Sequence, residues 1–402
     1  MKRYSFQDLK FTNLKETIRV FFLGNYYFDI DKAELYKAGD FRVENRDLLF
    51  SGKQRKLEQL IDNGFSNLYN TLTKRKTIYI HQNSGIPLIG SSYFGIVDRN
   101  TNLIELRPNT GCNLNCIYCS INESGKKAVD FVVEAEYLAQ ELEKLIMLKD
   151  TEEIEIHINP QGEPLLYKPL AHLVSLVKKI QAVKRISIDT NATALTKKKI
   201  DELIDAGITQ FNISIDSLDE KKAQKISSFK YPVEKIKESA PYIKNKVNLF
   251  LTPLYLPGIN DNDIEDIIVF AKKIKANIGI QNFLCYSQGK NPCKSMPMEK
   301  FYDKLRTLEK KHNLKLIYTA TDFKITKTNT LQYPFKKNEI IDCEIISQGR
   351  LEDEVIAKAK GRLIEVRDSK KTSGRAKAKI NRTKHNIFKA TAVGSSAKTK
   401  KI

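Results

Sequence analysis

The chain of 402 residues carries 68 Lys and Arg against 48 Asp and Glu, which gives a formal charge of +20. It has no apolar run near the roughly 18 residues that cross a bilayer and no signal segment in residues 1–10, so we expect a soluble, cytoplasmic protein without a membrane partner. Its six irregularly spaced cysteines do not indicate a disulfide framework. The charge surplus indicates a polyanionic partner, and the alternative is the Lys-rich composition of heat-adapted proteins.

The first hundred residues form an N-terminal extension, 1–100, to which we assign no function. A helix is expected at residues 56–61 and a strand at 77–81, directly after the basic run Lys74, Arg75 and Lys76. Residues 94–107 predict a hairpin that leads into the next segment.

Three cysteines, Cys112, Cys116 and Cys119, follow this hairpin with C-x3-C-x2-C spacing. The spacing brings three thiolates into one short loop, and three thiolates on a cubane [4Fe–4S] cluster leave its fourth iron open to another ligand. A zinc loop is the alternative, but zinc sites usually add a fourth Cys or His close by, and the sequence has none there. We therefore predict that these cysteines bind a [4Fe–4S] cluster.

The middle of the chain alternates strands with helices. Strands are expected at residues 154–158, 185–189, 211–215, 247–251 and 278–284. Between them, apolar residues recur at helical spacing, as in Leu170, Leu173, Val174 and Val177. Such alternation predicts a parallel sheet covered by helices, which is an α/β fold.

The cysteine run, with Tyr118 directly before the third cysteine, resembles the signature of the radical S-adenosylmethionine (SAM) superfamily. The resemblance implies a partial (β/α)6 barrel within residues 101–320 and SAM bound to the open iron. It also implies a one-electron donor such as ferredoxin or flavodoxin. One electron would cleave SAM to methionine and a 5′-deoxyadenosyl radical, which abstracts a hydrogen atom from the substrate. We assign no catalytic residue beyond the cluster ligands.

The same resemblance implies a SAM site at the carboxyl ends of the strands. Residues 159–164 resemble the family segment Gly-Gly-Glu-Pro, with Gln161 in place of the first glycine, and there the backbone and the Glu bind the SAM amino group. The residues expected to bind SAM are Tyr118, Gly162, Glu163, Thr190, Asn191, Ser214 and Asp216. The alternatives are an ordinary turn at 162–164 and helix-capping roles for the polar strand ends.

An auxiliary iron–sulfur cluster is an alternative role for Cys285, Cys293 and Cys343. Their wide spacing favours ordinary buried cysteines instead. His157 alternates within a strand, and we expect it to be a strand residue rather than a metal ligand.

After an expected linker at 321–342, residues 343–394 carry short alternating strands. Residues 344–402 hold 16 Lys and Arg against 6 Asp and Glu, so half of the net charge lies there. The segment resembles a TRAM domain, a small β-barrel related to OB-type folds that occurs on RNA-modifying enzymes. We expect Lys377, Lys379, Arg382 and Lys384 to bind RNA phosphates; the alternative is a solvated edge strand. Residues 395–402 form a basic tail.

The overall pattern is similar to archaeal radical SAM proteins with a C-terminal TRAM domain. No Cys occurs before Cys112, which argues against the methylthiotransferases, whose N-terminal domain carries three further cysteines. The resemblance favours an enzyme that modifies tRNA or rRNA. The alternative is a radical SAM enzyme that modifies a protein or peptide; a non-catalytic RNA-binding protein would leave the three-cysteine loop unexplained.

Overall fold

A seven-stranded sheet forms the centre of the computed structural model, which describes residues 1–121, 129–286 and 289–394. Its strand order is β17-β15-β14-β13-β12-β10-β9. The parallel strands are β10 (Leu103–Arg107), β12 (Ile154–Ile158), β13 (Val183–Thr190), β14 (Gln210–Ile213), β15 (Asn248–Leu251) and β17 (Asn277–Ile278). β9 (Gly95–Asp98) pairs antiparallel with β10, as the predicted hairpin requires. The predicted partial barrel of six parallel strands is confirmed.

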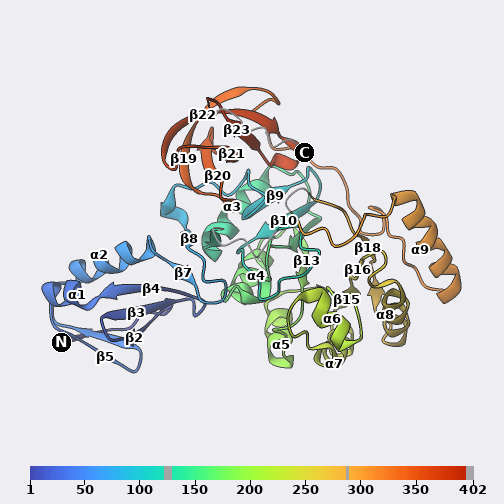
Figure 1. Ribbon diagram of the computed structural model, residues 1–402, viewed down its shortest axis with the longest axis horizontal. Helices are drawn as coiled ribbons and strands as arrows, with labels where there is room; N and C mark the ends of the chain where they lie inside the picture. The colour runs from blue at the N-terminus through green and yellow to red at the C-terminus, as the bar shows by residue number, and fades with distance from the viewer. Residues whose placement is uncertain (122–128, 287–288, 395–402) are drawn as a thin grey trace.

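Helices follow the parallel strands along the chain and bury their apolar faces against the sheet (Figure 1). They are α3 (Ala135–Met147), α4 (Leu170–Lys178), α5 (Lys197–Ala206), α6 (Glu220–Ser227), α7 (Val233–Lys244), α8 (Asp261–Lys273) and α9 (Met298–His312). In α5 the Thr196 side chain accepts from the Lys199 N–H, which caps the first turn, and Gly207 at φ +128° ends the helix. Two short parallel pairs join β8 (Thr77–Ile80) to β11 (Asp130–Val133) and β16 (Leu254–Tyr255) to β18 (Gln281–Asn282).

The N-terminal residues form a separate α/β unit at the left of Figure 1. Its four-stranded sheet has the order β2-β3-β4-β7, and a three-stranded sheet has the order β1-β6-β5. The elements are β1 (Lys2–Tyr4), β2 (Leu9–Asn13), β3 (Thr17–Phe22), β4 (Tyr26–Asp31), α1 (Lys32–Ala38), β5 (Phe41–Glu44), β6 (Asp47–Phe50), α2 (Gln54–Phe65) and β7 (Tyr69–Asn70). The sequence predicted only the core of α2 and strand β8 in this region.

The C-terminal residues close into a five-stranded barrel with the order β19-β20-β21-β23-β22. Its strands are β19 (Ile340–Gln348), β20 (Glu354–Ala359), β21 (Arg362–Arg367), β22 (Gly374–Arg382) and β23 (Lys389–Ala392). The barrel therefore begins before Cys343, within the expected linker. The expected basic tail at 395–402 lies outside the described residues.

The barrel is docked onto the central sheet unit through β21 and the residues directly before β23. Leu363 N–H donates to the Ile89 carbonyl and Phe388 N–H to the Gly90 carbonyl, both at 2.8 Å. Buried Glu365 accepts from the hydroxyls of Ser91 and Ser92. Residues 86–98 therefore cover this side of the barrel.

Part of the expected linker packs against the start of the sheet. Arg185 Nη2 donates to the Phe323 carbonyl at 2.9 Å, and Asn102 Nδ2 donates to the Lys324 carbonyl at 3.0 Å. The segment therefore covers one end of the partial barrel. None of the described helices is both long enough and apolar enough to span a membrane.

Candidate functional site

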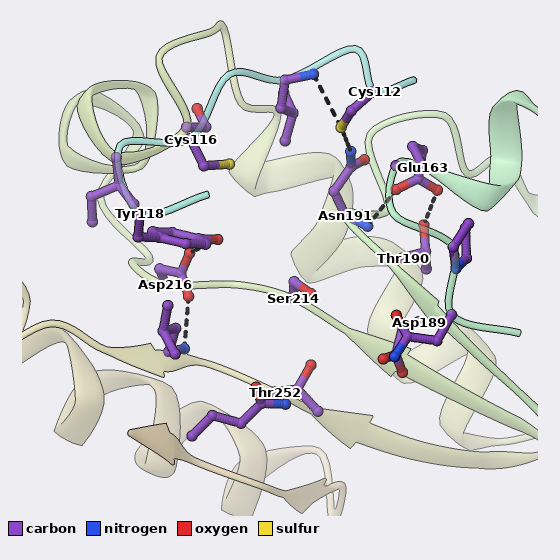
Figure 2. A pocket seen from close by; sticks show the side chains of 18 of the residues that line it. Cys112, Cys116, Tyr118, Glu163, Asp189, Thr190, Asn191, Ser214, Asp216 and Thr252 are labelled. Atoms are coloured by element: carbon purple, nitrogen blue, oxygen red, sulfur yellow. Dashed lines mark hydrogen bonds between the residues drawn. The ribbon is translucent and has the colours of Figure 1, made fainter. Parts of the chain in front are cut away.

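A cavity of about 480 Å³ opens at the carboxyl ends of β12, β13 and β14, beside the cysteine loop (Figure 2). It gathers most of the predicted site residues: Cys112, Cys116, Tyr118, Gly162, Glu163, Thr190, Asn191, Ser214 and Asp216. The parallel strands explain this arrangement, because their carboxyl ends meet on one side of the sheet. Cys119 does not line the cavity, although its carbonyl accepts from Lys290 N–H at 2.9 Å, which fixes the end of the loop.

Neighbouring elements hold the cysteine loop in place. Asn115 N–H donates to the Ser227 carbonyl at 3.1 Å and Ile117 N–H to the Ile226 carbonyl at 2.9 Å, at the end of α6. On the other side Gly111 forms a parallel backbone bridge with Gly162. The loop thus has backbone partners on two sides.

The surroundings of Cys112 suit a thiolate. Its Sγ receives the Leu114 N–H at 3.4 Å and the Asn191 side-chain amide at 3.8 Å. Burial, followed by the charge of Asp216, raises the pKa of Cys116 to about 12, but coordination to a metal keeps a thiol deprotonated. Among the described residues, no three His, Cys, Asp or Glu side chains are placed to hold one metal ion. A cubane cluster does not need such a geometry, because each thiolate binds a different iron, so this loop fits a [4Fe–4S] cluster.

Glu163 joins the segment after β12 to the end of β13. Its carboxylate accepts from Thr190 Oγ1 at 2.6 Å, Asn191 N–H at 2.8 Å and Leu165 N–H at 3.0 Å. Burial raises the pKa of Glu163 to about 7, although these hydrogen bonds lower it in part. A carboxylate offers about four lone-pair positions, which leaves room for one more donor from the cavity.

Tyr118 and Asp216 lie on the opposite wall of the cavity (Figure 2). Tyr118 Oη donates to Asp216 Oδ2 at 2.6 Å, and Asp216 Oδ1 accepts from Leu254 N–H at 2.8 Å. Burial raises the pKa of Asp216 to about 6. Ser214 lies between the two walls, and its carbonyl accepts from Tyr231.

Three polar residues in the cavity region were not predicted as site residues. His157 Nε2 lies 2.8 Å from Asp189 Oδ1, and Asn212 Nδ2 donates to the same oxygen at 2.7 Å. Burial lowers the pKa of His157, but the charge and hydrogen bond of Asp189 outweigh it and leave the pKa raised. The signal in the sequence was the alternation of β12, which turns His157 to the same side of the sheet as Glu105 and Asp189.

His157 and Asp189 also line a second cavity of about 360 Å³. It shares Thr252 and Gln281 with the first one, so the two cavities adjoin. Its other walls are largely aromatic and aliphatic, with Phe250, Phe301, Tyr318, Phe323, Leu305 and Leu316.

The structure does not bring the three remaining cysteines together in one place. Cys343 is buried in the core of the C-terminal barrel, whereas Cys285 and Cys293 neighbour each other on the loop after β18, with Cys285 Sγ 3.7 Å from the Cys293 carbonyl. Packing of Cys343 as a small apolar side chain explains its position.

The four predicted RNA-binding cations are all exposed on the barrel, on β22 and in the 3₁₀ turn Lys384–Asn386. Lys377 and Lys379 point to the same side of β22, but Asp342 lies directly across from Lys377 on β19. Burial lowers the pKa of His385, and the nearby charges of Arg99, Lys384 and Arg382 lower it further. Arg99 lines the first cavity while remaining partly exposed.

Comparison with known proteins identifies the central region. The family model of the radical SAM superfamily matches residues 106–271. An uncharacterised protein of Methanocaldococcus jannaschii is 37% identical over 362 residues, which cover 82% of this chain and 83% of the relative. A GTP 3′,8-cyclase of Thermodesulfovibrio yellowstonii is 30% identical over 199 residues, 48% of this chain and 59% of the cyclase.

Solved structures show weaker likenesses. A structure of TYW1 with a lysine-pyruvate adduct aligns with a TM-score of 0.43 and 19% identity, covering 57% of this chain and 80% of the other. Streptococcus suis SuiB aligns with a TM-score of 0.43 and 13% identity, covering 78% and 71%. These scores are too low to indicate a substrate.

Proposed function

The chain belongs to the radical SAM superfamily, and we propose that it modifies an RNA, either tRNA or rRNA. The superfamily uses a [4Fe–4S] cluster and SAM, and it needs a reductant. With both bound, an electron from the reductant would pass through the cluster and cleave SAM to methionine and a 5′-deoxyadenosyl radical, which would take a hydrogen atom from the substrate.

In this proposal Cys112, Cys116 and Cys119 hold the cluster, and the walls of the first cavity hold SAM. The remaining acceptor position of Glu163 is suited to the SAM ammonium. Asn191 is suited to the SAM carboxylate or ribose, since its backbone N–H donates to Glu163 and its side-chain amide donates to Cys112 Sγ. Tyr118 and Asp216, on the opposite wall, would orient the rest of the cofactor.

The second cavity then provides the place for the target base. It adjoins the proposed SAM cavity along the pair His157 and Asp189, and its aromatic walls match the faces of a flat ring. A base in a duplex must leave its stack to reach such a pocket. His157 and Asp189 could orient polar edges of that base by hydrogen bonds.

The main support for an RNA substrate is the position of cationic side chains on the C-terminal barrel and beside the first cavity. Lys384 and Arg382 on the C-terminal barrel and Arg99, which lines the first cavity, all lie close enough to His385 for their charges to act on it. Cations that connect an outer surface with a reaction site favour a polyanion that extends from one to the other. Glu354 and Glu365 are buried at the docking face, so these two carboxylates of the barrel are not part of its exposed surface.

The decisive experiment compares modified nucleosides of total tRNA and rRNA between a strain lacking the gene and its parent by mass spectrometry. We expect one nucleoside to disappear and to return when the wild-type gene is supplied, but not with Cys112→Ala. Unchanged nucleosides, together with purified protein free of ribonuclease-sensitive ultraviolet absorbance, would shift support to a protein or peptide substrate.

A further inference from the structure

The outer face of the N-terminal four-stranded sheet carries a row of aromatic residues that the proposed function does not use. The strand register places Phe21 of β3 opposite Tyr27 of β4, and Tyr27 opposite Tyr69 of β7. Lys10 of β2 lies opposite Phe21 at one end, and Lys76 bridges Tyr69 at the other. Five neighbouring residues therefore cross the sheet in one line, which we call the aromatic row: Lys10, Phe21, Tyr27, Tyr69 and Lys76.

This face is not part of the protein core. The opposite sides of the same strands bury Phe11, Val20 and Phe28, while Phe21 and Tyr27 are half-buried and Tyr69 is 38% exposed. The helices α1 and α2 lie on the buried side of the sheet (Figure 1). A sheet does not need aromatic residues at the outward positions of three neighbouring strands for folding, although such cross-strand pairs do add some stability.

The rings form a continuous surface. The ring centres of Phe21 and Tyr27 are 6.4 Å apart, and those of Tyr27 and Tyr69 are 6.0 Å apart with an angle of 31° between their planes. The Arg19 guanidinium lies 4.2 Å from the centre of the Tyr27 ring and is fixed by two 2.8 Å hydrogen bonds to Asp29. Aromatic rings and guanidinium planes are the groups on which unpaired bases stack.

The positive charge around the aromatic row indicates which kind of molecule binds there. Residues 1–80 carry 15 Lys and Arg against 10 Asp and Glu, and exposed lysines occupy both ends of the row. Cations beside stacking rings are the combination that binds single-stranded nucleic acid, since the lysines contact phosphates while the rings contact bases. A protein partner with an apolar patch would not require a cation at each end.

The row also leads toward the reaction site. The turn after Tyr69 places Thr73 and Arg75 on the wall of a small cavity of about 210 Å³, together with Cys112 and Asn113 of the cysteine loop. Thr73 Oγ1 donates to Asp130 Oδ2 at 2.6 Å, and Asn70 Nδ2 donates to the same oxygen. The sheet is therefore tied to the segment that positions the cluster ligands.

We propose that the aromatic row of Phe21, Tyr27 and Tyr69 is a stacking platform for an unpaired segment of the RNA substrate. This proposal rests on the proposed function, because it assumes that the substrate is RNA. The platform holds bases without selecting a sequence, and it works beside the cations of the C-terminal barrel, which contact phosphates.

The test measures binding of a short uridine oligonucleotide and of the same oligonucleotide without bases. Loss of one stacking ring should weaken binding by about 5- to 150-fold, so Tyr27→Ala and Tyr69→Ala should each weaken binding of the normal oligonucleotide. Binding of the abasic one should not change. Tyr27→Trp, which keeps a stacking ring, should retain wild-type binding. A role only in sheet stability would lower the melting temperature but would leave the preference for bases intact, and this result would overturn the proposal.

A fluorescence measurement gives a second readout, because the chain contains no Trp. Tyr69→Trp introduces a single reporter on the platform, and stacked bases should quench its emission. Tyr36→Trp is the matched control, since Tyr36 is 59% exposed in the same unit but lies on α1. Equal quenching of the two reporters would contradict the platform.

Failure of the platform and failure of the RNA substrate are distinguishable. If the alanine variants bind normally while neutralised barrel cations weaken binding, the platform is wrong and the proposed function stands. If the wild-type protein binds neither oligonucleotide nor folded RNA, the proposed function itself fails. Dissociation of a dimer by Tyr69→Ala in sedimentation, without an effect on oligonucleotide binding, would instead assign the row to contact with a second copy of this chain.

Discussion

Gly162 and Gly111 pair in a parallel backbone bridge, and Glu163 N–H donates to the Gly111 carbonyl at 3.0 Å. A Cβ atom on Gly162 would overlap the backbone of Gly111. We therefore expect Gly162→Ala to push the segment after β12 away from the cysteine loop, at a cost of about 1–3 kcal/mol in stability. The variant should bind less iron after anaerobic reconstitution and should bind SAM weakly, as measured by iron analysis and equilibrium dialysis.

Gly279→Ala is the matched control for this prediction. The atoms nearest to a Cβ at Gly279 lie 3.7 Å away, so a methyl group fits there. Its iron content should equal that of the wild type. Wild-type iron content and SAM affinity in Gly162→Ala would show that the close approach of the two loops is not required.

The pKa of Glu163 makes SAM binding depend on pH. Burial raises this pKa from 4.5 to about 7. The protonated Glu163 side chain therefore adds to the stability of the folded protein below pH 4.5, and this contribution is lost as the pH rises through about 7. An SAM ammonium needs the ionised form. SAM affinity should therefore rise by about tenfold between roughly pH 6 and pH 8.

Glu163→Gln removes the titrating group while keeping the size of the side chain. Its SAM affinity should be low and nearly constant over the same range, and calorimetry on cluster-loaded protein measures both profiles. A parallel rise in the variant would assign the pH dependence to another group.

A substitution in the ion pair of Lys149 and Asp98 tests how much this pair stabilises the contact between the C-terminal barrel and the core. Both side chains are fully buried, with Lys149 Nζ 2.5 Å from Asp98 Oδ1, and Asn386 of the barrel donates to the other Asp98 oxygen. Lys149→Met leaves a buried charge without its partner, so we expect a loss of about 3–5 kcal/mol in the free energy of unfolding.

Lys144 provides the comparison, because it lies on α3 and makes an exposed pair with Glu141. Lys144→Met should cost no more than about 1 kcal/mol. Denaturant unfolding of both variants measures the difference, and similar small losses would mean that the buried pair adds little to the docking.

The sequence predicted the partial barrel well, because period-3.6 helices and short apolar strands leave strong local patterns, as in Leu170 to Val177. It predicted the N-terminal sheet poorly. There the outward-facing positions of β3 and β4 hold the half-buried Phe21 and Tyr27, so the usual alternation of apolar and polar residues is hidden.

The cavity residues at strand ends were found through motif resemblance, whereas the pair of His157 and Asp189 was not. Their contact depends on the register of β12 against β13, in which His157 lies opposite Ser187. The register between two strands cannot be predicted from a single sequence. Likewise, nothing local in Glu365 indicates that Ser91 and Ser92 bury it, because these residues meet only when the barrel docks.

The last prediction concerns the barrel cations Lys377, Lys379, Arg382 and Lys384, which are exposed on β22 and the turn that follows it. If all four contact phosphates of single-stranded RNA, raising the salt from 50 to 200 mM should weaken binding roughly 50-fold. Changing all four to Gln should flatten this dependence and should weaken binding of different RNA sequences alike, since phosphate contacts carry no sequence information. Filter binding across a salt series measures both effects.

Point substitutions are preferable to removing the barrel, because the barrel covers residues 86–98 and its loss would expose the buried Asp98. The control neutralises four other exposed lysines on and around α4 and α5: Lys178, Lys179, Lys184 and Lys198. Their loss should leave the salt dependence close to that of the wild type, because none of them lies on the barrel or lines the first cavity. An equal flattening in both quadruple variants would mean that net charge alone attracts the RNA and that the barrel face has no special role.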